Sequence, residues 1–246
     1  MTEVAIVTGG AGGLGRVYCR GLAAAGYAVV VADLGDATDV VAELERAGGQ
    51  ALAVRVDVSD DASTRALAQT VLAAFGRIDG LVNNAAHYTA IVKTGFEELS
   101  VEEWDRCFAV NVRGAWLCSR AVAPTMRSQG SGKIVNVSSM TVPTAPPGFA
   151  HYIASKAAIV GLTRSLAREL GPDGICVNTL TPDYVAFDRD YDRRQPEMRN
   201  ALAAQRIFAR EAQPDDLVGT LLYLLGHGSD FVTGQDVWVN GGRAFH

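Results

Sequence analysis

The sequence is short of positive charge and has no long apolar run. It carries 22 lysines and arginines against 27 aspartates and glutamates, for a formal net charge of −5, and its basic residues form no cluster. Neutralising phosphates requires clustered lysine and arginine, so this balance argues against nucleic acid as a partner. The longest apolar stretches, such as residues 28–32 and 221–225, are far shorter than the roughly 20 residues of a membrane-spanning helix.

Signals for export and for metal binding are also missing. The start, Met1–Thr2–Glu3, leads straight into a β-branched run without a basic region or an apolar signal core, so we expect a cytoplasmic protein. The few cysteines form no CxxC pair, which favours buried thiols in a reducing compartment, and the histidines show no ligand spacing, so no metal is expected. These residues are Cys19, Cys107, Cys118 and Cys176, and His87, His151, His227 and His246.

What the sequence does contain is a regular alternation of strand and helix patterns. No linker, repeat or change of composition interrupts it, so we predict one α/β domain over residues 1–246, with a doubly wound, Rossmann-like parallel sheet of seven strands and helices on both faces. The strands are expected at residues 4–7, 28–32, 52–56, 79–83, 133–137, 175–180 and 236–239. Ser100 and Glu103 suggest a capping box, and Pro214 begins a last helix ending at Leu225. The polar segment 183–213 is predicted to be a substrate loop.

A glycine-rich turn joins the first strand to the first helix. Residues 8–15 read Thr-Gly-Gly-Ala-Gly-Gly-Leu-Gly, and such a turn lets backbone amides and a helix N-terminus approach a pyrophosphate. Asp33 ends the next strand, eighteen residues after Gly15, where a carboxylate suits ribose hydroxyls and repels a 2′-phosphate. NAD is therefore favoured over NADP. The alternatives are a simple tight turn and a solvated acid, and Arg16 is expected to lie along the helix.

Tyr152 and Lys156 stand four residues apart at the start of a helical pattern, so their side chains share one face. A free tyrosine has a pKa of about 10, and a lysine ammonium beside the phenol favours the phenolate. Bringing that pKa to neutrality requires roughly 4 kcal/mol, which a nearby cation and a helix N-terminus can supply. Tyr152 would then exchange a proton with an alcohol or carbonyl oxygen. The alternative is a half-buried tyrosine with a solvated lysine.

Further polar and glycine residues fall at the predicted strand ends. They are Thr8, Gly9, Gly13 and Gly15; Asp57 and Val58; Asn83, Asn84 and Ala85; Asn111; and Ser139, which precedes Tyr152 by thirteen residues. With Tyr152 and Lys156, they give the chain a resemblance, over essentially its whole length, to the short-chain dehydrogenase/reductase family. That resemblance implies reversible hydride transfer between an alcohol and the nicotinamide C4 of NAD, without a metal.

The resemblance also implies roles for individual residues. Tyr152 would be the acid/base, Ser139 would bind the reacting oxygen, Lys156 would bind the nicotinamide ribose, and Asn111 would kink its helix and complete a proton relay. Ser138 is the rival of Ser139, but neighbours on a strand point to opposite faces. The expected cofactor contacts are Gly9, Gly13, Leu14, Gly15, Asp33, Leu34, Asp57, Val58, Asn83, Ala85, Tyr152, Lys156, Pro182 and Val185.

The sequence departs from the family pattern in three places. Pro182 is followed by Asp183 instead of the usual glycine, and Phe187 stands where a threonine commonly touches the cofactor. Asp183 is either an exposed turn acid or an acid facing the substrate. Val185 can still offer its backbone to the cofactor carboxamide, and Ala86 replaces a glycine beside the pocket.

The candidate pocket residues are mostly apolar or aromatic, although ordinary loop packing is their alternative interpretation. They are His87, Tyr88, Met140, Phe149, Tyr184 and Phe187. They favour a small-molecule secondary alcohol or ketone with an apolar or aryl substituent. A 3-oxoacyl-carrier-protein reductase and a catalytically silent NAD-binding sensor are the other candidates. Asp33 speaks against the NADPH that such reductases commonly use, and the intact Asn111, Ser139, Tyr152 and Lys156 set speaks against the sensor. The resemblance further implies a homotetramer.

Overall fold

All seven strands form one parallel sheet in the order β3-β2-β1-β4-β5-β6-β7. The structure is a computed structural model that describes residues 2–185 and 196–246. The strands are β1 (Val4–Thr8), β2 (Ala28–Asp33), β3 (Ala51–Arg55), β4 (Gly80–Asn83), β5 (Gly132–Val137), β6 (Ile175–Pro182) and β7 (Asp236–Val239). The predicted α/β class, the parallel pairing and the seven strands are confirmed.

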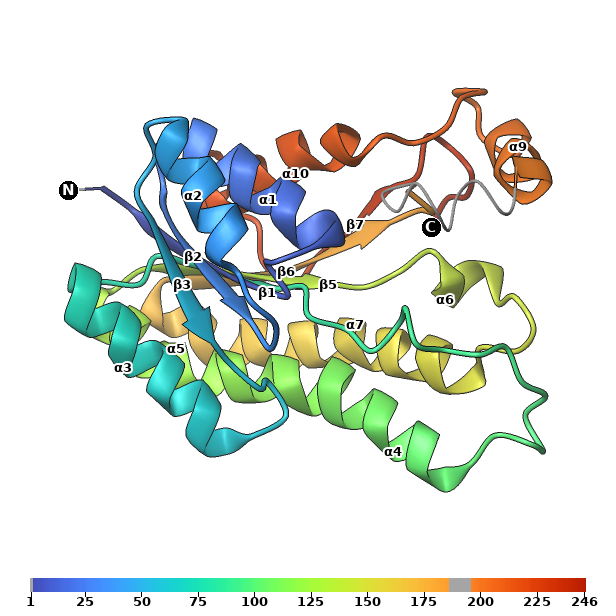
Figure 1. The fold of residues 1–246 in the computed structure, drawn as a ribbon, viewed down its shortest axis with the longest axis horizontal. Coiled ribbons are helices and arrows are strands. Elements are labelled where there is room, and N and C mark those ends of the chain that lie inside the picture. Colours follow the sequence, from blue (N-terminus) through green and yellow to red (C-terminus); the bar gives the residue numbers. More distant parts are fainter. Residues whose placement is uncertain (1, 186–195) are drawn as a thin grey trace.

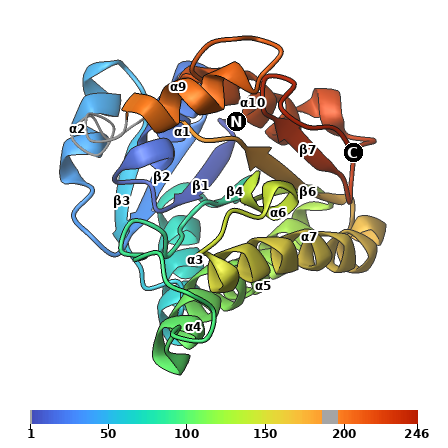
Figure 2. The same ribbon diagram turned by 90° about the vertical axis from the view of Figure 1, so that its right-hand side faces the viewer.

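Helices cover both faces of this sheet. Figure 1 shows α1, α2 and α10 on one side and α3, α5 and α7 on the other, and the end-on view of Figure 2 shows the same layers. The helices are α1 (Gly13–Ala24), α2 (Thr38–Arg46), α3 (Asp61–Phe75), α4 (Val101–Phe108), the π-helical η1 (Ala109–Arg113), α5 (Gly114–Gln129), α6 (Thr141–Thr144), α7 (Ala150–Leu170), η2 (Gly171–Asp173), α9 (Pro196–Ala204), η3 (Pro214–Leu217), α10 (Val218–Leu225) and η4 (His227–Ser229).

The core lies in two apolar layers, one on each face of the sheet. Alternate residues of one strand feed different layers: Ile6 packs toward α3 and α5, whereas Val7 packs toward α1 and α10. Since both faces are covered, the central strands are continuous apolar runs rather than alternating ones. The four cysteines are buried and unpaired, as predicted.

Some element boundaries differ from the sequence-based predictions. Residues 101–129 form one helical stretch, in which the π-helical η1 joins α4 to α5. The last helix begins as a 3-10 turn, Pro214–Leu217. Ser100 caps α4 by accepting from the Glu103 amide, but the Glu103 carboxylate pairs with His87 instead of closing the predicted capping box.

The substrate loop predicted at 183–213 is only partly described. Phe187 lies outside the described residues. The described part of the loop contains α9, and the 3-10 turn Pro214–Leu217 follows the loop. Within the described ranges, no helix has the length and apolar character needed to cross a membrane. Residues 2–185 and 196–246 also contain no group of three or more histidine, cysteine or acidic side chains arranged to hold a metal.

Candidate active site

The glycine turn has the backbone shape that its sequence predicts. Gly9 and Gly13 adopt left-handed φ values of 64° and 50°, which L side chains rarely reach. A Cβ on Gly15 would lie 1.9 Å from the carbonyl oxygen of Gly9, so only glycine allows the turn to close there. The N-cap of α1 is Gly12, which supplies no side-chain acceptor, and its own Cβ position faces open space. Leu14 lies half-buried in the first turn of α1.

Asn84 braces this turn from the neighbouring strand end. Its Nδ2 donates to the carbonyls of Thr8 (3.0 Å) and Gly9 (3.2 Å). In return, the Thr8 hydroxyl accepts from the amides of Asn84 (3.0 Å) and Ala85 (3.1 Å). The sequence motif contained Asn84 but did not indicate that its side chain reaches back to the first strand. β1 and β4 pair directly, so the two strand ends are held together.

Asp33 lies at the end of β2 beside the turn. One carboxylate oxygen accepts from the Ala11 amide and the other from the Gly35 amide, both at 2.9 Å. Because both partners are neutral, the negative charge of Asp33 stays uncompensated at this point. Leu34, the next residue, is 59% exposed. Arg16 lies along α1, as expected, and is paired with Glu43 of α2 at 2.5 Å.

Four further predicted cofactor residues lie around the same edge. Asp57 is exposed, and its carboxylate accepts from the Ser59 amide at 2.9 Å. Val58 is buried against Gly114, where an added Cβ would be 2.8 Å from a Val58 methyl group. Asn83 is 6% exposed and donates to Asn136 of β5 (2.8 Å), so its amide joins β4 to β5. Ala85 is half-buried just beyond β4.

Helix α7 brings Tyr152 and Lys156 together in the interior. Their exposed fractions are 7% and 3%, and the Lys156 Nζ lies 5.8 Å from the centre of the Tyr152 ring. That ammonium donates to the Val137 carbonyl at 2.7 Å. The Ser139 hydroxyl hydrogen-bonds to the Tyr152 phenol. The Ser138 hydroxyl donates to the Lys156 carbonyl at 2.9 Å, so it is held by the backbone of α7.

Burial shifts both ionisable groups of this pair. It raises the pKa of Tyr152 well above its usual value of 10, and the nearby Tyr88 adds to this effect while Ser139 opposes it. Burial also lowers the pKa of Lys156 to about 8. The spacing of Tyr152 and Lys156 predicted that the pKa of the phenol would be lowered. The direction differs because desolvation penalises the phenolate more than an ammonium directed at a backbone carbonyl stabilises it.

Asn111 occupies the π-helical turn between α4 and α5. Its Nδ2 donates to Ser155 of α7 at 3.0 Å and contacts the Cys107 sulfur at 3.3 Å. Its Oδ1 accepts from the His87 amide at 2.7 Å. Insertions of this type in helices are frequent at functional sites. The predicted distortion of this helix at Asn111 is therefore present, and Asn111 connects the helix to the strand-end loop.

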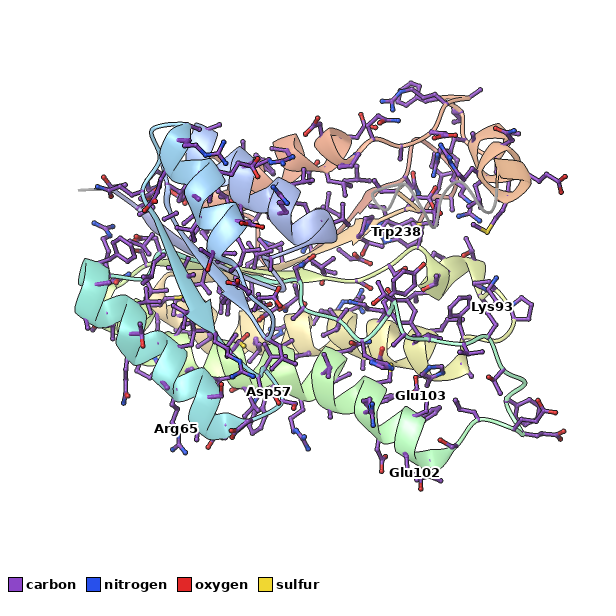
Figure 3. All side chains as sticks on the ribbon, viewed as in Figure 1. Asp57, Arg65, Lys93, Glu102, Glu103 and Trp238 are labelled. Atoms are coloured by element: carbon purple, nitrogen blue, oxygen red, sulfur yellow. The ribbon has the colours of Figure 1, made fainter. Side chains whose placement is uncertain are left out.

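Two histidines share the Glu103 carboxylate next to this loop. His87 Nε2 lies 2.7 Å from Glu103 Oε1, and His151 Nε2 lies 3.7 Å from the same oxygen. His151 is 1% exposed, and within the described part of the chain neither ring nitrogen has a hydrogen-bond partner. Burial lowers the pKa of His151. Figure 3 shows Glu103 on α4 near the end of the molecule where α6 and α9 lie.

The predicted pocket residues divide into ring contacts and packed side chains. Tyr88 and Phe149 approach the Tyr152 ring with centroid distances of 5.1 and 6.3 Å. Lys93, labelled in Figure 3, lies over the Phe149 ring with its Nζ 5.3 Å from the centroid. Met140 is 1% exposed and its sulfur accepts from Asn240 at 3.6 Å, which places it under the C-terminal tail. Its predicted substrate contact stays a prediction.

Asp183 is neither of the two things that its position in the sequence suggested. Its side chain is 1% exposed and pairs with Arg206 at 2.8 Å and with Arg243 at 2.7 Å. Tyr184 and Val185 follow it, and Val185 is buried in a bridge to Ala212. Pro182 is the last residue of β6. Asp183 is therefore buried and ion-paired at the start of the segment predicted as a substrate loop.

A separate depression of about 500 Å³ lies at the amino-terminal edge of the sheet, lined in part by Glu3, Arg77 and His227. It shares no residue with the predicted site. The catalytic and cofactor candidates instead surround the carboxyl ends of the strands, where α/β folds bind their ligands.

Comparison with known proteins agrees with this geometry. A family profile described as enoyl-(acyl carrier protein) reductase matches residues 9–244. The chain belongs to the short-chain dehydrogenase/reductase family. The resemblance inferred from the motifs is thereby confirmed.

Members of the family that carry out different reactions resemble this chain to a similar degree. The 3-oxoacyl-[acyl-carrier-protein] reductase FabG of Staphylococcus aureus is 36% identical over 245 residues, covering 98% of each chain. The cyclopentanol dehydrogenase of Comamonas sp. is 37% identical over 243 residues, covering 98% of this chain and 96% of that protein. An NAD(P)-dependent gluconate 5-dehydrogenase structure from Beutenbergia cavernae, with bound NADP at low occupancy, is 37% identical, with a TM-score of 0.90 and coverage of 98% and 96%.

Proposed function

We propose that this oxidoreductase is an NAD(H)-dependent enzyme that interconverts a secondary alcohol and a ketone with an apolar or aryl substituent. The observation that carries the proposal is the Tyr152 phenol. It is buried at the carboxyl edge of the sheet, hydrogen-bonded to Ser139, and flanked by Lys156 on one side and by Tyr88 and Phe149 on the other. A proton donor in an aromatic surrounding suits a carbonyl next to an apolar group.

The residues at the glycine turn fit a dinucleotide. The α1 N-terminus has no side-chain cap, and a Cβ at Gly12 would meet nothing within 4 Å, so the first amides of α1 can approach a pyrophosphate. Asp33 offers a charged acceptor for ribose hydroxyls and would repel a 2′-phosphate. Relatives with bound NADP exist in the family, so the preference for NAD rests on Asp33 of this chain. Asp57, Val58 and Val185 are proposed as further cofactor contacts.

Each of the four proposed catalytic residues has a separate role. When bound, the nicotinamide ring supplies or accepts the hydride. In ketone reduction, Tyr152 donates its phenolic proton to the carbonyl oxygen while Ser139 hydrogen-bonds to that oxygen. Because burial raises the pKa of Tyr152, the phenol stays protonated at neutral pH, which is the form that reduction requires. Lys156 holds the ribose, and Asn111 orients the loop at His87 and connects the site to α7.

The substrate class can be tested with a panel of ketones. Aryl ketones, cyclic ketones and short β-ketoacyl thioesters are incubated with NADH and with NADPH, and turnover is followed at saturating cofactor. We expect aryl ketones with NADH to give the highest kcat/KM. Turnover confined to the thioesters would reject the aryl-ketone assignment and support a 3-oxoacyl-carrier-protein reductase, the activity for which the Staphylococcus aureus relative is named.

A catalytically silent NAD-binding sensor is the alternative from another class. It predicts cofactor binding without turnover of any member of the panel. The buried Tyr152 phenol with Ser139 and Lys156 next to it supports the enzyme, because a binding protein has no need of a buried proton donor beside a lysine of lowered pKa.

We propose a homotetramer in the cytoplasm. Exposed aromatic side chains lie where subunits would meet: Trp104 and Trp116 on α4 and α5, and Phe231 and Phe245 flanking β7. Unpartnered apolar surface of this kind is typical of interfaces. The four unpaired thiols suit a reducing compartment. Sedimentation velocity tests the assembly, and a monomer at micromolar concentration would reject it.

A further inference from the structure

A cluster of buried charges lies directly beside the proposed substrate site. Asp183 follows β6 without a turn between them, and its amide donates to the Val239 carbonyl of β7 at 3.2 Å. Its two carboxylate oxygens are divided between two arginines, with Oδ2 accepting from Arg206 at 2.8 Å and Oδ1 from Arg243 at 2.7 Å. The side chains of Asp183 and Arg206 are 1% and 3% exposed. The three charges are therefore shielded from solvent.

Arg206 uses its remaining donors to tie the two ends of the substrate segment to each other. Its Nη2 donates to the Tyr184 carbonyl at 2.8 Å and its Nη1 to the Arg210 carbonyl at 3.0 Å. Tyr184 lies at the start of the predicted substrate loop (residues 183–213), and Arg206 and Arg210 lie in its last part, after α9. One guanidinium thus bridges both ends, and it is itself held by the carboxylate of Asp183.

The C-terminal tail contributes the third charged side chain of the cluster, Arg243. Gly241 and Gly242 adopt φ values of 62° and 80°, and a Cβ on Gly242 would lie 2.9 Å from Ile207. The Gly241 carbonyl accepts from the Phe208 amide at 3.1 Å. This close approach brings Arg243 within reach of Asp183 and of Gln205, to which it donates at 3.0 Å. Three segments that are distant in sequence therefore meet at one acid.

Stability alone does not explain such a cluster. A buried ion group loses hydration, and apolar residues of similar volume often stabilise a fold as well or better. What the cluster provides is direction, because the planar Arg206 guanidinium donates from its three nitrogens to three fixed acceptors. The glycine usual at this position in the family has no side chain and cannot make these contacts.

We infer that Asp183 is a positioning residue for substrate binding. By holding Arg206 and Arg243, it fixes the backbone of Tyr184 and Val185 just after Pro182, whose carbonyl accepts from the amide of the pocket candidate Met140 at 3.0 Å, and it anchors the return of the chain after α9. The inference rests on the proposed function for its kinetic consequence, whereas its structural consequence can be measured without turnover.

The main variant is Arg243→Gln, since Arg243 is 14% exposed and its loss leaves the Asp183–Arg206 pair in place. Asp183→Asn is the stronger variant, but it leaves two guanidinium groups without a counter-charge and can fail to fold. Arg210→Gln is the matched control. Arg210 is an arginine of the same segment whose side chain is 56% exposed and pairs with Asp216 at 2.6 Å. Arg243→Lys tests rescue by a cation.

Two measurements are made on the full-length protein. Hydrogen exchange of the wild type, Arg243→Gln and Arg210→Gln reports the fixation of residues 184–185 and 206–212. Steady-state kinetics with the best ketone of the panel report KM and kcat. We expect Arg243→Gln to speed exchange in those peptides about tenfold and to raise the ketone KM about tenfold, with kcat changed less than about threefold. Arg243→Lys should recover part of both effects, and Arg210→Gln should match the wild type.

Unchanged exchange in Arg243→Gln would overturn the inference whether or not the protein turns over a ketone. Faster exchange with an unchanged KM would also overturn it, because the cluster would then be a structural tie only. If the wild type turns over no member of the panel, the proposed function fails, and the exchange measurement still decides whether Asp183 fixes the segment.

Discussion

Two groups of buried ionisable side chains lie at the same end of the sheet and are built in opposite ways. Around Asp183, each charge has an opposite charge within 2.8 Å. Around Tyr152, the phenol and the Lys156 ammonium are buried with neutral partners, namely a serine hydroxyl and the Val137 carbonyl. The first group pairs one acid with two cations, whereas among the described residues no opposite charge contacts the ionisable groups of the second.

The difference explains which group is suited to chemistry. Paired charges keep their ionisation and hold backbone segments in place, whereas burial without an opposite charge shifts pKa values, raising that of the Tyr152 phenol and lowering that of the Lys156 ammonium. The pKa of Lys156 falls to about 8 for this reason. We therefore assign proton transfer to the Tyr152 group and positioning to the Asp183 group.

The largest expected effect comes from removing the proton donor itself. Tyr152→Phe keeps the ring that contacts Tyr88 and Phe149 but lacks the hydroxyl, so ketone reduction should fall about a thousandfold. Binding of NADH, followed by fluorescence titration, should stay within about threefold of the wild type. Tyr223→Phe on α10, where the side chain is 48% exposed, is the matched control. Turnover at the wild-type rate in Tyr152→Phe would remove the phenol from the mechanism.

A smaller effect is expected at Asp33, whose charge is also uncompensated. Asp33→Asn retains an acceptor for the Ala11 or Gly35 amide but loses the charge that would oppose a 2′-phosphate. The ratio of kcat/KM with NADH to that with NADPH should fall by about 10- to 100-fold, or roughly 1.4 to 2.8 kcal/mol. Asp36→Asn, at an exposed acid that accepts from Thr38, is the control. A ratio that does not move would show that Asp33 does not select the cofactor.

The smallest effect is expected at His151, a buried histidine that precedes Tyr152 in the sequence. Its ring is 1% exposed with neither nitrogen hydrogen-bonded within the described part of the chain, so His151→Phe should raise the free energy of unfolding by about 1 kcal/mol. His227→Phe, at a side chain that is 85% exposed, should change it by less than about 0.5 kcal/mol.

The same substitution carries a pH signature. Burial lowers the pKa of His151 below its ordinary value of 6.5, so at lower pH the unfolded chain binds a proton that the folded protein resists. The wild type should lose stability as the pH falls below about 6.5, and His151→Phe should lose less over that interval. Denaturant titrations at pH 5.5 and 7.5 measure both slopes, and equal losses would contradict a buried neutral His151.

Local patterns in the sequence predicted the fold, because its strands are short runs flanked by turns. They also indicated candidate site residues, and the choice of Ser139 over Ser138 stays a prediction. The position of Asn111 in a distorted helix followed from the family resemblance. What these features share is that neighbouring residues determine them.

The sequence could not show what depends on distant partners or on burial. Asp183 meets Arg206 and Arg243, 23 and 60 residues further along the chain, and no local pattern pairs them. The raised pKa of Tyr152 results from the depth at which α7 is packed, which YxxxK spacing does not reveal. Long-range contacts and solvent exclusion are properties of the folded chain.

The central claim is that Tyr152 and Lys156 form a buried pair without a compensating charge. The chain has three lysines, Lys93, Lys133 and Lys156, so NMR titration of their side-chain carbons gives three signals, with Lys156→Arg identifying one of them. We predict that the Lys156 signal titrates near pH 8. A Lys156 signal that titrates near the unperturbed lysine value of about 10.4 would contradict the account.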